Sequence, residues 1–146
     1  MSEKTSSLPW DSAEFLPQAH ALAGKRLGFI EHGGKRILTI NSVGADAQVV
    51  RAIAAECWHI ISSQEPKSVR TLNNLEGAEF TGETVKVLSE LAAKNQPYVV
   101  RGAVIGITGM RFFAFQAVVS LTKRPFKLFD SREQALDWLA QDDGPE

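Results

Sequence analysis

The sequence predicts one α/β domain, with a mainly parallel sheet of about five strands opened by an antiparallel hairpin, and about four helices. Three observations support this fold class. The 146 residues suit a single domain. Short β-prone runs alternate with helical periods, and a Gly-Gly pair separates the first two runs. Strands that alternate with helices pair in parallel, because each right-handed crossover lays its helix on a face of the sheet.

The first elements are a hairpin and a helix. Residues 27–30 and 36–40 are β-prone, and Gly33-Gly34 between them tolerates the positive φ of a tight turn. Asp46 is placed to cap a helix whose apolar residues recur three and four apart: Val49, Val50, Ile53, Ala54, Cys57, Ile60 and Ile61. Cys57 lies on this stripe, so we expect a core residue rather than a reactive thiol.

The remaining elements follow in alternation. We expect a strand over 68–72, a helix that ends before Pro97, and a highly apolar central strand over 98–107. A third helix over 110–122, a short strand over 126–129 and a last helix over 132–140 complete the domain. Ser131 is the predicted cap of the last helix, with Gln134 three residues later as in a capping box.

The ends of the chain differ from its body. Residues 1–24 contain Pro9 and Pro17 and no sustained period, so we expect an N-terminal arm, a type of segment that is more often mobile than structured. The single domain is expected over 25–141, with an acidic tail over 142–146. Residues 25–129 hold fourteen bases against eight acids, but these bases stand singly or in pairs. This pattern indicates a solvated surface rather than a nucleic-acid interface.

The composition and motifs exclude several classes of function. No apolar run reaches the roughly 18 residues of a membrane span, the polar start does not resemble a signal peptide, and one cysteine forms no internal disulfide. We therefore expect a cytoplasmic protein. His20, His32 and His59 are scattered and lack a nucleophile partner or metal-ligand spacing, so we expect no enzyme, no metal and no cofactor.

One glycine-rich turn is a candidate binding site. Gly106, Thr108, Gly109 and Arg111 lie where a strand passes into a helix, although the glycine spacing misses the dinucleotide fingerprint. Backbone N–H groups at the helix start, with Thr108 and Arg111, could hold an anion or ligand. Alternatively, the glycines only allow a tight turn and close packing.

Several runs resemble the SpoIIAA-like proteins, a bacterial branch of the STAS-domain superfamily. These are Asn95-Gln96-Pro97-Tyr98-Val99-Val100 with its continuation to Gly109, Pro66-Lys67-Ser68-Val69, and Phe129-Asp130 with Ala135-Leu136-Asp137-Trp138-Leu139. The resemblance covers about 35–140 and implies a STAS-like α/β sandwich, a cytoplasmic location and no established catalytic activity. Some members are also compared with lipid-carrying CRAL-TRIO domains.

The family's phosphorylation switch does not carry over. Anti-sigma-factor antagonists of this superfamily are switched at the serine of an Asp-Ser-x-Gly loop, which does not occur between residues 72 and 85. A degenerate loop stands in its place, formed by Asn74, Leu75, Glu76, Gly77, Thr81 and Gly82. Thr81 is the hydroxyl nearest the serine position, and no acid precedes it.

The helix over 110–122 predicts self-association. Met110, Phe113, Ala114, Ala117, Val118 and Leu121 form one apolar stripe that we expect to face the sheet, while Phe112, Phe115 and Val119 gather on the opposite, outward side. We expect a homodimer through the second group. The alternative is that the N-terminal arm covers it with Trp10, Phe15 and Leu16.

The sequence thus favours a non-enzymatic protein-interaction or regulatory module that lacks the phosphorylatable serine. The alternative is a carrier or sensor of a small apolar or lipid-like ligand. Fold analogy supports both functions.

Overall fold

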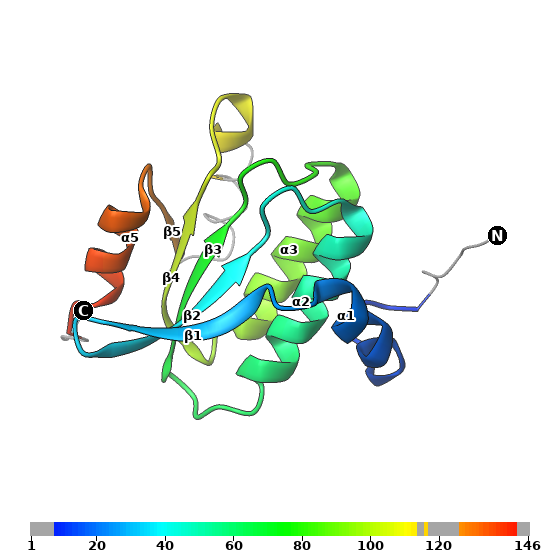
Figure 1. The fold of residues 1–146 in the computed structure, drawn as a ribbon, viewed down its shortest axis with the longest axis horizontal. Helices are drawn as coiled ribbons and strands as arrows, with labels where there is room; N and C mark the ends of the chain where they lie inside the picture. Colours follow the sequence, from blue (N-terminus) through cyan, green and yellow to red (C-terminus); the bar gives the residue numbers. More distant parts are fainter. Residues whose placement is uncertain (1–7, 114–115, 117–125, 143–146) are drawn as a thin grey trace.

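The computed structural model describes residues 8–113, 116 and 126–142, and these form a five-stranded sheet with helices on both faces (Figure 1). The strands are β1 Leu27–His32, β2 Lys35–Asn41, β3 Val69–Asn74, β4 Val99–Ile105 and β5 Phe126–Leu128. Their order in the sheet is β1-β2-β3-β4-β5. β1 and β2 pair antiparallel and all other neighbours pair in parallel, which confirms the predicted fold class.

The opening hairpin turns at the predicted glycines. Gly33 and Gly34 have φ of 59° and 80°, the positive values that a two-residue hairpin turn requires at both positions. A β-carbon at Gly33 would lie 2.8 Å from the β-carbon of Ala140, so this turn also meets the end of the last helix. Glycine is needed here both for the turn and for the close approach.

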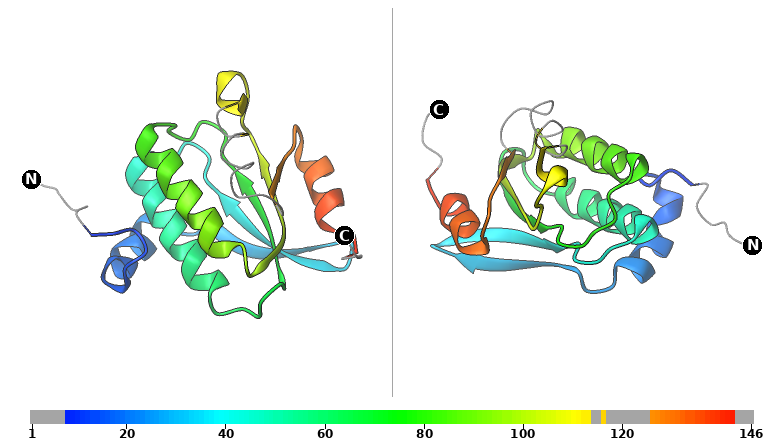
Figure 2. Two further views of the ribbon diagram at one scale, coloured as in Figure 1. Left: turned by 180° about the vertical axis from the view of Figure 1, so that it is seen from behind. Right: turned by 90° about the horizontal axis from the view of Figure 1, so that it is seen from above.

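The helices lie in two layers (Figure 2). α2 Ala47–Ile61 and α3 Gly82–Asn95 cover one face of the sheet, and α5 Arg132–Leu139 covers the other. The predicted caps are present, since the Asp46 side chain accepts a hydrogen bond from the Val49 amide and Ser131 accepts one from the Gln134 amide. Each bond satisfies a backbone donor at a helix start.

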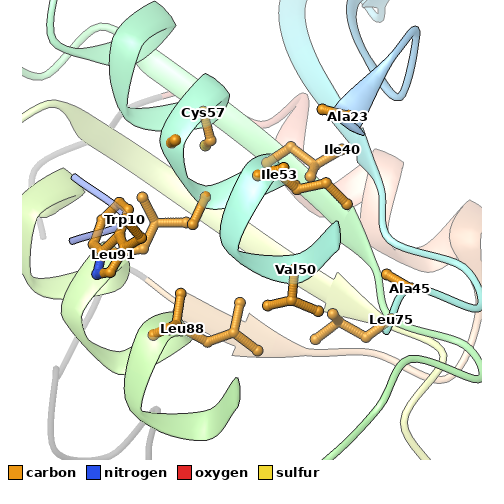
Figure 3. Packing of buried hydrophobic residues seen from close by; sticks show 14 of the residues in the cluster. Trp10, Ala23, Ile40, Ala45, Val50, Ile53, Cys57, Leu75, Leu88 and Leu91 are labelled. Carbon is orange, nitrogen blue, oxygen red and sulfur yellow. The ribbon is translucent and has the colours of Figure 1, made fainter. Parts of the chain in front are cut away.

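Alternating side chains of the strands supply a core on each face. In β2, Ile37 packs toward α5, whereas Leu38 and Ile40 belong to the larger cluster with α2 and α3. Figure 3 shows that larger cluster, with residues of α2 and α3 facing a shared interior. Because both faces of the sheet are covered, the central strands β3 and β4 each have four consecutive buried residues.

The predicted N-terminal arm contains a helix that the sequence analysis missed. A short 3-10 turn, η2 Ala13–Phe15, leads into α1 Leu16–Ala23, which packs along α2. The reading of residues 1–24 as a segment without helical period is therefore wrong over 16–23. Phe15, Ala19 and Ala23 are buried at a spacing of four, but two of these three are alanines and give little hydrophobic signal. Pro17 lies in the first turn, where proline is tolerated, and Gly24 ends the helix with φ of 60°.

Two arginines of the sheet hold the end of α5. The buried Arg70 of β3 donates from Nη1 to the carbonyl oxygens of Leu139 and Gln141. Arg101 of β4 donates from Nη1 to the carbonyl oxygen of Trp138 at 3.2 Å. The last carbonyls of a helix lack intrahelical partners and carry its negative dipole end, so these two cations complement α5.

Replacing Arg70 is therefore expected to loosen α5. We expect Arg70→Met to lower the free energy of unfolding by about 2–4 kcal/mol, because it leaves buried carbonyl groups without donors. Urea unfolding followed by circular dichroism measures this change. The matched control is Arg132→Met on the exposed side of α5, with an expected change below about 0.5 kcal/mol. Equal effects of the two variants would contradict the anchoring role of Arg70.

Candidate functional site

The turns that follow β3 and β4 meet at one edge of the sheet. Asn74 and Ile105 end these parallel strands as partners in register, and the Leu75 amide donates to the Ile105 carbonyl at 2.9 Å. Both turns lie at the same end of the sheet in Figure 1. The carboxyl edge of a parallel sheet is where α/β proteins most often place their sites. The structure thus brings together the degenerate switch loop and the glycine-rich turn, which the sequence analysis treated separately.

A pocket of about 200 Å³ lies between the two turns. The loop after β3 contributes Leu75, Glu76, Gly77 and Phe80, and the turn after β4 contributes Gly106, Ile107, Thr108 and Arg111. Of the remaining switch-loop residues, Thr81 is the N-cap of α3, Gly82 is its first residue, and Asn74 supports the turn. Gly109 is exposed at the other end of the turn.

Hydrogen bonds tie the loop after β3 to its neighbours. The Asn74 side-chain oxygen accepts from the Glu76 amide at 3.1 Å, a turn held by its own asparagine. The loop after β2 adds two backbone bonds, from the Ser42 amide to the Asn74 carbonyl and from the Gly44 amide to the Glu76 carbonyl, each 2.9 Å. Three consecutive loops of the edge are therefore joined.

Gly106 is required for the close approach of the two turns. It has φ of 88°, and a β-carbon there would lie 2.5 Å from Asn74 Oδ1 and 2.6 Å from the Glu76 nitrogen. Because the second neighbour is backbone, it could not move aside cheaply. The structural reading of this glycine therefore has direct support.

Arg111 connects the turn with the opposite wall of the pocket. Its Nη1 donates to the Ala78 carbonyl at 3.3 Å, and its guanidinium carbon lies 5.7 Å from the centre of the Phe80 ring. Arg111 and Thr108 are exposed, so both can still contact a bound group. Binding of an anion at this turn stays a prediction.

Thr81 is engaged at the start of α3. Its hydroxyl oxygen accepts from the Thr84 amide at 3.2 Å, and Thr84 Oγ1 accepts from the Thr81 amide at 2.8 Å. The two threonines form a reciprocal capping box that the sequence analysis did not identify, because threonine stands where the usual motif has Glu or Gln. The hydroxyl nearest the family's serine position thus stabilises a helix start.

The start of the next helix faces the other way from the prediction. Residues 110–113 are helical, and Phe112 packs against the main core, whereas Met110 and Phe113 are 85% and 72% exposed. The sequence predicts the reverse, with Phe112 facing outward and Met110 and Phe113 facing the sheet. A helical period shows which residues share a face of the helix. When both faces carry an apolar stripe, the period does not show which stripe packs against the sheet. Phe115 and Val119, the other members of the predicted face, lie outside the described residues.

The residues that most often carry catalysis lie apart. His20 pairs with Glu56, His32 pairs with Asp137, and His59 is exposed on α2. In the described part of the chain, no group of three His, Cys, Asp or Glu side chains is placed to hold a metal ion. Over the same residues, no helix combines the length and apolar character that a membrane crossing requires.

Cys57 is a core residue, as predicted. It is fully buried, and burial raises the pKa of its thiol to about 12, against a smaller lowering by the hydrogen bond from Asn95. The reactive form of cysteine is the thiolate. The thiol therefore remains protonated and inert at neutral pH.

Replacing Gly106 is expected to distort the pocket. We expect Gly106→Ala to lower the free energy of unfolding by about 2–4 kcal/mol, through the positive φ and the collision with Glu76. The control is Gly109→Ala, which has φ of 66° but no atom within 4 Å of the added β-carbon. It is expected to cost only the backbone part, about 1–2 kcal/mol. If urea unfolding gives the same loss for both variants, the close approach does not constrain the edge.

The shifted pKa of Cys57 predicts a loss of stability in alkali. From the ordinary thiol value of 9.0 up to about 12, the unfolded chain releases this proton while the folded chain retains it. The free energy of unfolding therefore falls with rising pH, by up to about 1.4 kcal/mol per pH unit from this group. Cys57→Ala lacks this contribution, so the stability of wild type relative to Cys57→Ala should decline between pH 8 and pH 11 in urea unfolding. A constant difference would refute the buried-thiol explanation.

Comparison with known proteins gives a likeness of fold. No family model matches the sequence, and no curated protein matches it significantly. An uncharacterised DUF3478 protein with a SpoIIAA-like fold from Shewanella loihica PV-4 aligns with a TM-score of 0.62 and 18% identity, over 77% of this chain and 91% of that chain. An anti-sigma-factor antagonist (STAS) domain protein from Planctomyces limnophilus aligns with a TM-score of 0.57 and 14% identity, over 79% and 98%. The strand order, the helical layers and these two structures together show that the chain has a STAS-type, SpoIIAA-like fold.

Proposed function

We propose that the protein is a non-enzymatic, cytoplasmic interaction module that binds through the carboxyl edge of its sheet and first of all pairs with a second copy of itself. The observation that carries the proposal is the exposure of Met110 and Phe113 beside the pocket of that edge. Burying a large apolar side chain contributes about 1.5–3 kcal/mol, so two such side chains left in water favour association. Closed two-fold pairs are the commonest assemblies of soluble proteins.

The absence of an Asp-Ser-x-Gly motif between residues 72 and 85 supports recognition by contact alone. The loop over 74–83 carries one hydroxyl, that of Thr81, which caps α3. The loop accepts hydrogen bonds from the Ser42 and Gly44 amides and donates one from the Leu75 amide to the Ile105 carbonyl, so it offers a fixed surface. We infer that the edge is ready to bind without modification.

The pocket at the sheet edge supports a protein contact rather than an apolar ligand at that edge. Its volume of about 200 Å³ is below the roughly 300–1,000 Å³ of typical small-molecule pockets. Glu76 and Arg111 line it together with Leu75 and Phe80, so the lining is charged as well as apolar. Such a hollow suits one side chain of a partner better than a lipid-like body.

The expected result for Met110→Ser/Phe113→Ser is a folded monomer, whereas the wild type dimerises in a concentration-dependent way in analytical ultracentrifugation. Phe29→Ser is the matched control, because Phe29 is also an exposed aromatic residue but lies on β1 beneath Arg36. This control should dimerise like the wild type. A wild type that stays monomeric at high micromolar concentration rules out the homodimer.

Photo-crosslinking in cells tests the interaction module apart from the homodimer. A photoreactive residue at position 113 should join the chain to one specific protein, identified by mass spectrometry, and the same residue at position 29 should not. A second copy of the chain as the product supports the full proposal. A specific crosslink to a different protein supports the interaction face but contradicts self-association. Equal crosslinking from positions 113 and 29 contradicts the interaction face.

A further inference from the structure

A second hollow lies away from the sheet edge, between the segment that precedes η2 and the helices α2 and α3. It is an open groove of about 630 Å³, with Trp10 on one wall and Val87 and Lys94 of α3 on the other. Arg51 of α2 also lines it. None of these residues belongs to the proposed interaction face, so the two sites are independent.

Three contacts hold the N-terminal wall of the groove in place. The Trp10 indole Nε1 donates to Glu90 Oε1 at 2.8 Å, and Lys94 Nζ lies 3.4 Å from Asp11 Oδ2. Arg51 donates from Nη2 to the Leu8 carbonyl. The Trp10 ring packs against α3, as Figure 3 shows. The wall is thus built, although the sequence analysis read this segment as an arm.

Arg51 is a buried cation with an unused donor. It is 6% exposed, and its guanidinium carbon lies 4.6 Å from the centre of the Phe15 ring. Its Nη1 is buried and has no hydrogen-bond partner. Among the described residues, no carboxylate lies within ion-pair distance of Arg51, whereas the two lysines of the groove are paired, Lys94 with Asp11 and Lys86 with Glu90.

The buried guanidinium of Arg51 lacks an anionic partner within the described part of the chain. Arginine keeps its charge inside proteins, so the cost of burying Arg51 has to be offset by its contacts. The face of the Phe15 ring attracts the cation but accepts no conventional hydrogen bond from Nη1. A buried charge without a partner and an unmade hydrogen bond both cost free energy, and an anion at the groove would remove both costs.

We propose that this groove binds a small organic anion, a carboxylate or a phosphate monoester, whose oxygens accept hydrogen bonds from the Arg51 guanidinium. The planar fork of arginine matches either group with two parallel bonds. Because Nη1 is buried, binding requires the guanidinium to rotate until Nη1 faces the groove. Val87 and Ala93 are the apolar residues that α3 contributes to the lining, which also contains the carboxylates of Asp11, Glu83 and Glu90.

The test is a titration of the full chain with phenyl phosphate and with benzoate, using benzyl alcohol as the neutral control. The Trp10 indole N–H and the Arg51 Nε–H report binding in two-dimensional NMR spectra, with the indole signal assigned from Trp10→Phe. We expect saturable shifts with at least one anion and none with the alcohol. The stronger of the two anions identifies the ligand group as phosphate or carboxylate.

Variants locate the site. Arg51→Met should weaken anion binding about tenfold or more, and Arg51→Lys, which keeps the charge without the fork, should fall between it and the wild type. Arg36→Met is the matched control, because Arg36 is an exposed arginine of β2 that lines neither hollow, and it should bind as the wild type does. If Arg51→Met does not fold, the anion affinity of Arg51→Lys tests the proposal in its place, because it should be lower than that of the wild type.

Three outcomes would overturn the proposal. Unsaturated shifts with both anions would mean that the groove holds no site. Wild-type affinity in Arg51→Met or Arg51→Lys would place the anion elsewhere. Loss of binding in Arg111→Met alone would assign it to the sheet edge.

Discussion

The constraint on which the structure depends is that a largely parallel sheet must be covered on both faces. The crossover helices α2 and α3 cover one face, and their apolar stripes supply most of the core. The other face is covered by α5, a helix of eight residues, whose docking relies on Arg70 and Arg101 as well as on apolar packing. Once both layers are in place, the parallel register brings Asn74 and Ile105 to one edge and fixes the position of the turns that follow.

The two sites use the fold in different ways. At the sheet edge, the backbone groups of three loops form hydrogen bonds with one another. The proposed contact there therefore depends on exposed apolar side chains. In the groove a polar group remains unsatisfied. The Trp10 indole bonds to Glu90 in its wall, but Arg51 Nη1 has no hydrogen-bond acceptor among the described residues. The proposed contact face and the proposed anion groove have no lining residue in common, so occupation of one leaves the residues of the other free.

Much of the fold could be predicted because its signals are local. The glycine pair, the caps Asp46 and Ser131, and the stripe through Cys57 each depend on residues within a few positions of one another. α1 escaped prediction because Ala19 and Ala23 bury little area. The direction of Phe112 depends on tertiary packing, which a helical period does not encode. At the candidate site, the component turns could be predicted from sequence, but the bond between Leu75 and Ile105 that unites them spans 30 residues.

The order of the strands in the sheet equals their order in the chain. Each new strand therefore adds to the edge left by the strand before it, and no strand has to be inserted between two that are already paired. A chain emerging from the ribosome can assemble such a sheet progressively, with each unit using its predecessor as a template. The arginines that bind the end of α5 lie on β3 and β4, which precede α5 in the chain, so α5 packs on strands that are already synthesised. The topology thus lets folding follow the direction of translation.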